Sequence, residues 1–129
     1  MRSLIAVLAG GTVAAVLFQI GAVLAFVMLY GIPLGAAPGP PSVGYFGLNL
    51  GFAALAALAG GRITANLARR RRRAHVAIVA VGLAAMAVWG FSGPASHWPG
   101  WYPPTLALVG LAGVLAGGIP RRTGPDASD

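Results

Sequence analysis

Long apolar blocks dominate the chain, and short segments rich in proline, glycine or arginine separate them. The blocks cover residues 4–30, 43–67, 74–91 and 103–119. A helix rises about 1.5 Å per residue, so each block would be about 25–40 Å long as a helix. The hydrocarbon core of a bilayer is about 30 Å thick. The pattern therefore predicts an all-α fold, an integral membrane bundle of four transmembrane helices.

The first block has a second interpretation, because a basic residue, Arg2, followed by an apolar run also begins a cleaved signal peptide. The run continues without a charge to Tyr30, which is longer than the roughly 7–15 residues of a signal-peptide core. A membrane-spanning helix is therefore favoured. We expect one membrane domain over residues 1–120 and a disordered tail over residues 121–129.

Composition identifies the solvent that suits these helices. The chain is 57% hydrophobic and 9% charged, whereas a soluble domain carries about 25% charged residues. A soluble protein of this composition would expose large apolar patches and aggregate. Its many glycines and alanines, with arginine as the sole basic residue type, are typical of a GC-rich bacterial genome. We therefore expect a multi-pass protein of a bacterial inner (plasma) membrane.

The basic residues predict the orientation in the membrane. They are Arg2, Arg62, Arg69, Arg70, Arg71, Arg72, Arg73, Arg121 and Arg122. In a four-span arrangement all of them lie on one side, and cytoplasmic loops are the loops enriched in arginine and lysine. Both termini and the middle loop are therefore expected inside, with the run 69–73 against anionic lipid headgroups. The net charge of +7 could also indicate nucleic-acid binding, but charges that flank apolar spans favour a topology signal, and no nucleic-acid partner is expected.

The two segments on the opposite side carry no charge. Trp98, Trp101 and Tyr102 lie in the second of them. Aromatic residues of this kind gather at the level of the lipid headgroups. We expect these three side chains to form an interfacial belt.

The halves of the chain share a faint internal similarity. Residues 40–42 and 103–105 each read Pro-Pro-Ser or Pro-Pro-Thr, and each begins a helix rich in small residues that ends near Gly-Gly and an arginine. Each of these helices follows an apolar block and an uncharged loop. The bundle could consist of two parallel hairpin repeats, although chance similarity between alanine- and glycine-rich helices is an equal alternative.

Small residues recur at helical spacing in the second and fourth blocks. Such faces let two helices approach closely, and a Gly-x-x-x-Gly pair is the commonest example. Seven positions are candidates for helix packing: Gly47, Gly51, Ala54, Gly61, Gly110, Gly113 and Gly117. The pair Gly47 and Gly51 could form a packing seam inside the monomer or a seam between two copies.

Few polar side chains lie inside the blocks. Gln19 and Asn49 are the amides, and a buried amide in a membrane usually bonds a neighbouring helix, with a contribution of about 0.6 kcal/mol. Asn49 could pair with Gln19 or face the outer water, and the alternative for both is to line a path for a solute. Thr12 and Thr64 most simply bond back to their own helices.

The chain lacks the residues of most enzyme chemistry. It has no cysteine, which excludes disulfides and thiolate catalysis, and its only acidic residues, Asp126 and Asp129, lie in the tail. No Ser/His/Asp set can assemble on one side, and no Gly-Lys-Ser/Thr phosphate loop is present. His75 and His97 belong to opposite sides of the predicted bundle, which argues against a metal site. We expect no enzyme activity, cofactor or metal.

The segment that joins the second and third blocks contains a motif similar to one in a group of known proteins. Gly60-Gly61-Arg62, then Ala68-Arg69-Arg70, then His75 before an apolar helix resembles small four-span bacterial membrane proteins of unknown function. In that group a Gly-Gly … Arg-Arg-Pro … His segment joins the second and third helices, and an uncharged aromatic loop precedes a short fourth helix. Here Arg72 or Arg73 stands where proline is usual, so the junction is expected to be more helical. The resemblance covers most of the chain in layout and implies no activity.

Three functions fit these observations. The first is a non-enzymatic interaction or assembly subunit, which packs through its glycine faces with another copy or another membrane protein. The second is a small oligomeric channel or permease with Gln19 and Asn49 lining a path. The third is a lipid-contacting accessory of an enzyme that uses the run 69–73.

Overall fold

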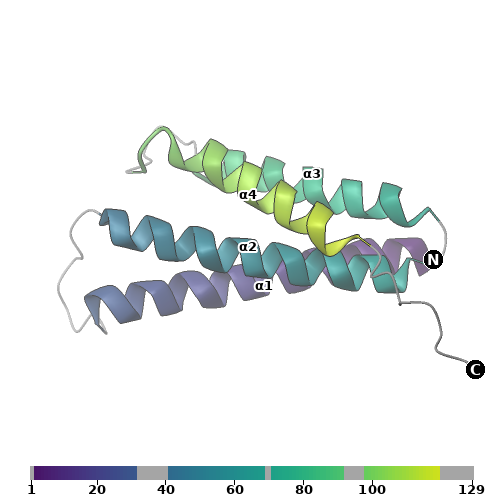
Figure 1. The fold of residues 1–129 in the computed structure, drawn as a ribbon, viewed down its shortest axis with the longest axis horizontal. Coiled ribbons are helices and arrows are strands. Elements are labelled where there is room, and N and C mark those ends of the chain that lie inside the picture. The colour runs from purple at the N-terminus through teal and green to yellow at the C-terminus, as the bar shows by residue number, and fades with distance from the viewer. Residues whose placement is uncertain (1, 32–40, 69–70, 92–97, 120–129) are drawn as a thin grey trace, which may run out of the picture.

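The computed structural model describes residues 2–31, 41–68, 71–91 and 98–119. Over these ranges the chain forms four α-helices (Figure 1), which are α1 (Arg2–Tyr30), α2 (Val43–Leu67), α3 (Arg72–Phe91) and α4 (Tyr102–Gly117). The predicted all-α fold of four helices is confirmed. The expected tail over residues 121–129 lies outside the described residues.

Three of the helices are long and apolar enough to cross a membrane. The qualifying segments are Leu4–Tyr30, Val43–Leu67 and Arg72–Gly90. Helix α4 is also apolar but has 16 residues, a little short of the about 17–25 that a spanning helix uses.

The ends of the helices follow from local chemistry. Ser42 is the N-cap of α2, and its hydroxyl accepts a hydrogen bond from the Tyr45 backbone N–H at 3.3 Å. Pro103 and Pro104 occupy the first turn of α4, where a missing N–H costs nothing. Helix α3 begins at Arg72 instead of the expected residue 74, and α4 ends at Gly117 instead of 119.

Consecutive helices run antiparallel, so α1 with α2 and α3 with α4 form two hairpins (Figure 1). Helix α2 packs closely on both α1 and α4, and α3 packs on α4, whereas α1 and α3 touch more sparsely. The central contact of the bundle is therefore the one between α2 and α4. The hypothesis of two hairpin repeats stays a prediction.

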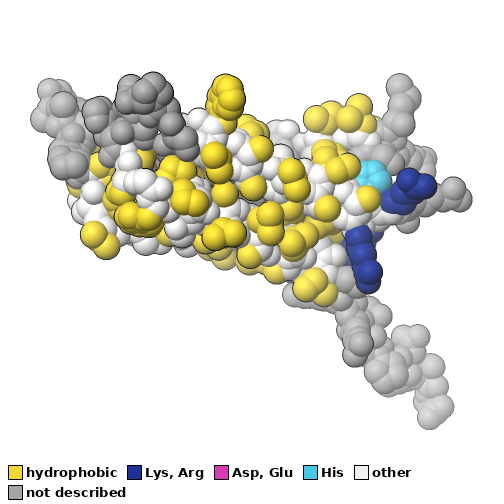
Figure 2. Space-filling view, turned by 90° about the horizontal axis from the view of Figure 1, so that it is seen from above, with side chains coloured by type: hydrophobic (Ala, Val, Ile, Leu, Met, Phe, Trp, Pro, Cys, Tyr) yellow, Lys and Arg dark blue, Asp and Glu magenta, His cyan; other side chains and the backbone are white. Residues whose placement is uncertain are grey.

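Two clusters of buried residues fill the bundle. One contains Ala25, Tyr45, Phe46, Ala53, Tyr102 and Leu106. The other contains Ala57, Ala65, Val76, Val79, Ala80 and Val114. Outside these clusters large apolar side chains are exposed along all four helices, as in Leu4, Val43, Val81 and Leu108, and Figure 2 shows them over much of one face. This surface suits hydrocarbon far better than water.

The described basic side chains gather at one end of the bundle. Arg62 lies near the end of α2, and Arg71 and Arg73 lie beside the start of α3, all three exposed. Figure 2 shows the arginine and histidine side chains together at this end. Arg69, Arg70, Arg121 and Arg122 lie outside the described residues.

Candidate functional site

Helices α1 and α2 approach so closely that no side chain fits between them at two glycines. A Cβ atom added to Gly10 would overlap the Thr64 hydroxyl and lie 2.7 Å from the Gly60 carbonyl oxygen. A Cβ atom on Gly60 would lie 2.6 Å from the Ala14 Cβ and 2.7 Å from the Gly10 carbonyl oxygen. These distances are below van der Waals contact, so the two backbones touch directly here.

Helices α2 and α4 make a second close contact. A Cβ atom on Gly61 would overlap the Val114 carbonyl oxygen, and one on Gly117 would overlap that of Leu58. A Cβ atom on Gly113 would lie 2.7 Å from the Ala57 Cβ. The same added Cβ atom would lie 3.1 Å from the carbonyl oxygen of Ala54. Of the seven predicted packing positions, Ala54, Gly61, Gly113 and Gly117 thus meet in this contact.

Two neighbouring glycines let α2 serve both contacts at once. Successive residues of a helix point about 100° apart, so Gly60 faces α1 while Gly61 faces α4. Sequence reasoning identified Gly61 but missed Gly60 and Gly10. The signal was present in the pair Gly60-Gly61 and in the spacing of Gly10 and Ala14 along α1.

The remaining predicted packing glycines face open space. A Cβ atom on Gly47, Gly51 or Gly110 would meet no heavy atom within 4 Å, among the residues that the structure describes. Gly47 and Gly51 are exposed on α2, and Gly44, one turn earlier, is exposed as well. The Gly-x-x-x-Gly pair of α2 therefore takes no part in packing the described helices against one another.

Asn49 is buried in the contact between α2 and α4. Its side-chain N–H donates a hydrogen bond to the Tyr102 hydroxyl, and the two residues are 1% and 0% exposed. The Asn49 side-chain oxygen is buried and has no hydrogen-bond partner among the described residues. Neither alternative for Asn49 holds: it bonds Tyr102 of α4 and not Gln19, and it is buried away from the outer water.

An aromatic cluster surrounds this hydrogen bond. The Tyr102 ring packs on Phe46 at a centroid distance of 4.9 Å and stacks on Trp98 at 5.3 Å. Tyr45 also stacks on Trp98, at a centroid distance of 6.1 Å. Of the three residues expected in an interfacial belt, Trp101 is exposed, Trp98 is half-buried and Tyr102 lies fully inside the bundle.

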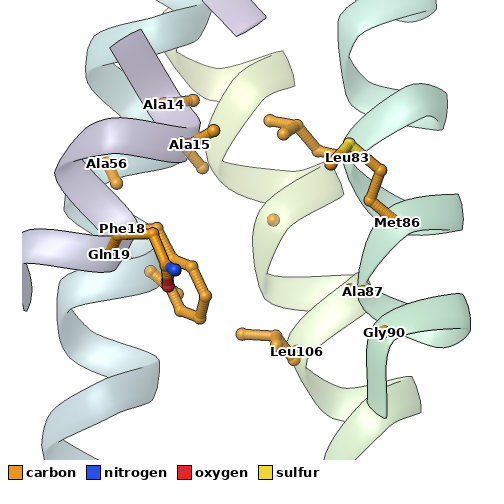
Figure 3. A pocket seen from close by; sticks show the side chains of 13 residues that line it. Ala14, Ala15, Phe18, Gln19, Ala56, Leu83, Met86, Ala87, Gly90 and Leu106 are labelled. Atoms are coloured by element: carbon orange, nitrogen blue, oxygen red, sulfur yellow. The ribbon is translucent and has the colours of Figure 1, made fainter. Parts of the chain in front are cut away.

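A cavity of about 360 Å³ lies between the helices (Figure 3). All four helices line it, with Ala14, Ala15, Phe18, Gln19, Ala53, Ala56, Ala57, Leu83, Met86, Ala87, Gly90, Leu106 and Gly110. Figure 3 shows Phe18 and Gln19 on the α1 side and Leu83 and Met86 on the α3 side. Gln19 is also exposed on the outer surface, which places it at the mouth. Asn49 does not line this cavity, so the two amides do not share a path here.

The basic end has a distinct local geometry. Arg71 has a positive φ of 50°, a conformation uncommon for a residue with a side chain. Its carbonyl oxygen lies 2.9 Å from the His75 Nδ1 and accepts the His75 backbone N–H at 3.3 Å. The His75 ring therefore folds back over the first turn of α3, against the carbonyl oxygen that its own backbone N–H also contacts. His97 lies outside the described residues.

Comparisons with known proteins do not place the chain in a family. No family model, no curated protein and no solved structure matches it. Within the described ranges, no group of three potential metal ligands lies together.

Proposed function

We propose that this chain is a non-enzymatic, four-span subunit of a bacterial inner membrane, and that it assembles with another membrane helix through an outward glycine face of α2. The face consists of Gly44, Gly47 and Gly51, which are spaced three and four residues apart and are all exposed. Spacing of this kind places small residues on one side of a helix, where a second helix can approach closely.

One observation carries this proposal, namely the division of the glycines into two sets. One set lies in the contact of α2 with α4 and contains Gly61, Gly113 and Gly117. The other set, Gly47 and Gly51, has no described heavy atom within 4 Å of an added Cβ atom. Glycine in a helix interior costs up to about 1 kcal/mol relative to alanine. Other helix glycines such as Gly82 are also open, but Gly44, Gly47 and Gly51 recur at helical spacing on one exposed face, and a face of this kind suits a contact with a second helix.

The proposed orientation places both termini in the cytoplasm. Arg62, Arg71 and Arg73 lie at one end of the bundle and the Tyr45–Trp98–Tyr102 cluster lies in the other half. Cytoplasmic segments are the ones enriched in arginine, and the exposed guanidinium groups suit anionic headgroups of the inner leaflet. In this proposal the arginines anchor the bundle and the lipid bilayer is its first partner.

The channel hypothesis has less support from the geometry. It requires Gln19 and Asn49 on one hydrated path, but Asn49 is sealed between α2 and α4 and Gln19 lies at the mouth of a lateral cavity. The aromatic cluster around Tyr102 also fills the space between α2 and α4 at its end of the bundle. Assembly is therefore the function that the arrangement supports best.

Leucine at Gly47 or Gly51 is expected to abolish contact with a partner helix while leaving the monomer intact, because neither position touches the rest of the described chain. A photo-reactive side chain at Leu55, which is exposed one turn further along the same face, reports the contact in native membranes. When Leu55 is the only position changed, we expect one covalent product of defined size between this chain and its partner. The same product should be lost when Gly51→Leu is added.

Gly82→Leu is the matched control, because Gly82 is an exposed helix glycine of α3 with no neighbour within 4 Å. It should retain the adduct. The proposal fails if the probe at Leu55 labels only lipid, or if Gly82→Leu and Gly51→Leu reduce the adduct equally.

A further inference from the structure

Helix α1 carries two exposed polar side chains, Thr12 and Gln19, that make no hydrogen bond in the described part of the chain. The other two threonines that the structure describes behave differently. The Thr64 hydroxyl donates to the Gly60 carbonyl at 2.9 Å, and the Thr105 hydroxyl donates to the Trp101 carbonyl at 2.7 Å. The expected bond of Thr12 back to its own helix is not formed.

Gln19 lies at a depth where water is scarce. It is about 17 Å along the helix from Tyr30 and about 26 Å from Arg2, so in a bundle that spans the membrane it lies inside the hydrocarbon core of about 30 Å. A polar group left unbonded in hydrocarbon costs several kcal/mol. Lipid chains offer neither a donor nor an acceptor to its amide.

The cavity beside Gln19 offers no side-chain partner either. The other residues that line it are alanine, glycine, phenylalanine, leucine and methionine. The backbone groups of the surrounding helices are occupied by their own helical hydrogen bonds. Among the described residues the amide has no hydrogen-bond partner, and a second chain can supply one.

The exposed face around Gln19 has the spacing of a helix-pairing seam. Thr12, Val16, Gln19 and Val23 are separated by four, three and four residues, and all four are exposed. Thr12 and Gln19 are seven residues apart, as are Val16 and Val23, and a seven-residue repeat is that of a left-handed pair of helices. The two polar residues lie seven positions apart, at equivalent places in the repeat.

We infer that α1 pairs with α1 of a second copy of this chain around a two-fold axis along the membrane normal, with the Gln19 amides of the two copies hydrogen-bonded to each other. Copies with the same orientation in the membrane place identical residues at identical depth, so a two-fold seam brings Gln19 against itself. An amide carries both donors and acceptors, and two of them can therefore satisfy each other.

This inference rests on the proposed membrane-spanning arrangement but uses a different surface from the glycine face of α2. The seam lies on α1, whereas Gly47 and Gly51 lie on α2. The dimer would leave both glycine faces open, one on each copy. The two proposals can therefore succeed or fail separately.

Cysteine crosslinking tests the seam directly, because the chain contains no cysteine. Val16→Cys and Val23→Cys should each form a disulfide-linked dimer under mild oxidation in membrane vesicles, since a disulfide requires Cα atoms within about 7 Å. Leu55→Cys on the glycine face and Val81→Cys on α3 are equally exposed controls. They should remain monomeric or crosslink far more slowly.

Gln19→Leu tests the hydrogen bond within the seam. It should raise the dissociation constant of the dimer by roughly 3- to 20-fold, the range that corresponds to measured interhelical hydrogen bonds in membranes. Gln19→Asn keeps an amide and should restore much of the association. Measurement of the Val16→Cys crosslink at a series of protein-to-lipid ratios gives the shift.

Crosslinking at Leu55→Cys instead of Val16→Cys would overturn the inference and place self-association on the glycine face. Equal association of Gln19→Leu and the parent chain would also overturn it. A chain that is monomeric in every variant but still forms the adduct at Leu55 would refute the α1 seam and leave the proposed function standing.

Discussion

Alanine at Gly61 is expected to destabilise the bundle by about 1–3 kcal/mol or more, the usual cost of overpacking. Its Cβ atom would overlap the carbonyl oxygen of Val114 on α4. A backbone carbonyl cannot rotate away as a flexible side chain can, so the two helices must separate. Separation removes dispersion contacts along the whole seam, and these contacts hold helices together in a membrane.

Gly117→Ala should behave in the same way, since its Cβ atom would overlap the Leu58 carbonyl oxygen from the opposite side of the seam. Gly47→Ala, on the same helix as Gly61, is the matched control because it meets no neighbour. Alanine should leave stability unchanged there, or raise it through its higher helix propensity. Helix content followed during titration with a denaturing detergent measures all three. A bundle in which Gly61→Ala unfolds no earlier than Gly47→Ala would contradict the described seam.

Truncation of Tyr102 to alanine is expected to cost about 3–5 kcal/mol, as for other large buried aromatic residues. The residue is 0% exposed, and its ring contacts Phe46, Trp98 and Trp101. Its loss would leave a cavity in the cluster that joins α2 to α4. Trp89→Ala is the control, because Trp89 is 89% exposed at the end of α3 and should change little.

Tyr102→Phe separates the hydrogen bond from the packing. It keeps the ring but removes the hydroxyl that bonds Asn49, leaving the buried amide unbonded at a cost of about 1–3 kcal/mol. In an Asn49→Leu background the same change should cost much less, because the amide is already gone. Equal costs in the two backgrounds would mean that the Asn49–Tyr102 bond does not stabilise the bundle.

Hydropathy alone predicted four helices, and the structure has them close to the expected bounds. The start of α2 was also predictable, because proline residues and Ser42 precede an apolar run and Ser42 caps the helix. Both signals are local, so no knowledge of the tertiary fold is required. The length of α4 was less predictable, since helix ends vary by one or two residues without a strong cap.

Contacts between residues far apart in the sequence could not be predicted from such local signals. The sequence marks Asn49 as an unusual polar residue but does not indicate Tyr102, which lies 53 positions away. Likewise Gly47 and Gly61 look equivalent in sequence, yet one is exposed and the other touches α4. Only the rotation of α2 against its neighbours distinguishes them, and that rotation depends on the whole bundle.

The helices of this chain carry two kinds of close-packing position, one inside the bundle and one on its surface. Contacts made by Gly10, Gly60, Gly61 and Gly117 hold the monomer together from within. In the proposed assembly, the exposed groups Gln19 on α1 and the glycine face of α2 contact other chains. All of this requires that the exposed apolar surface lies in a bilayer.

The most direct test of that requirement is cysteine labelling by a membrane-impermeant maleimide, applied from outside to cells with a permeabilised outer envelope. Ser42→Cys and Gly100→Cys lie at the uncharged end, and Asn66→Cys and Ile119→Cys lie at the basic end; all four positions are exposed. We predict labelling at the first pair and protection of the second pair until the membrane is disrupted. Labelling of Asn66→Cys or Ile119→Cys in intact membranes would contradict a bundle that spans the membrane with its arginines inside.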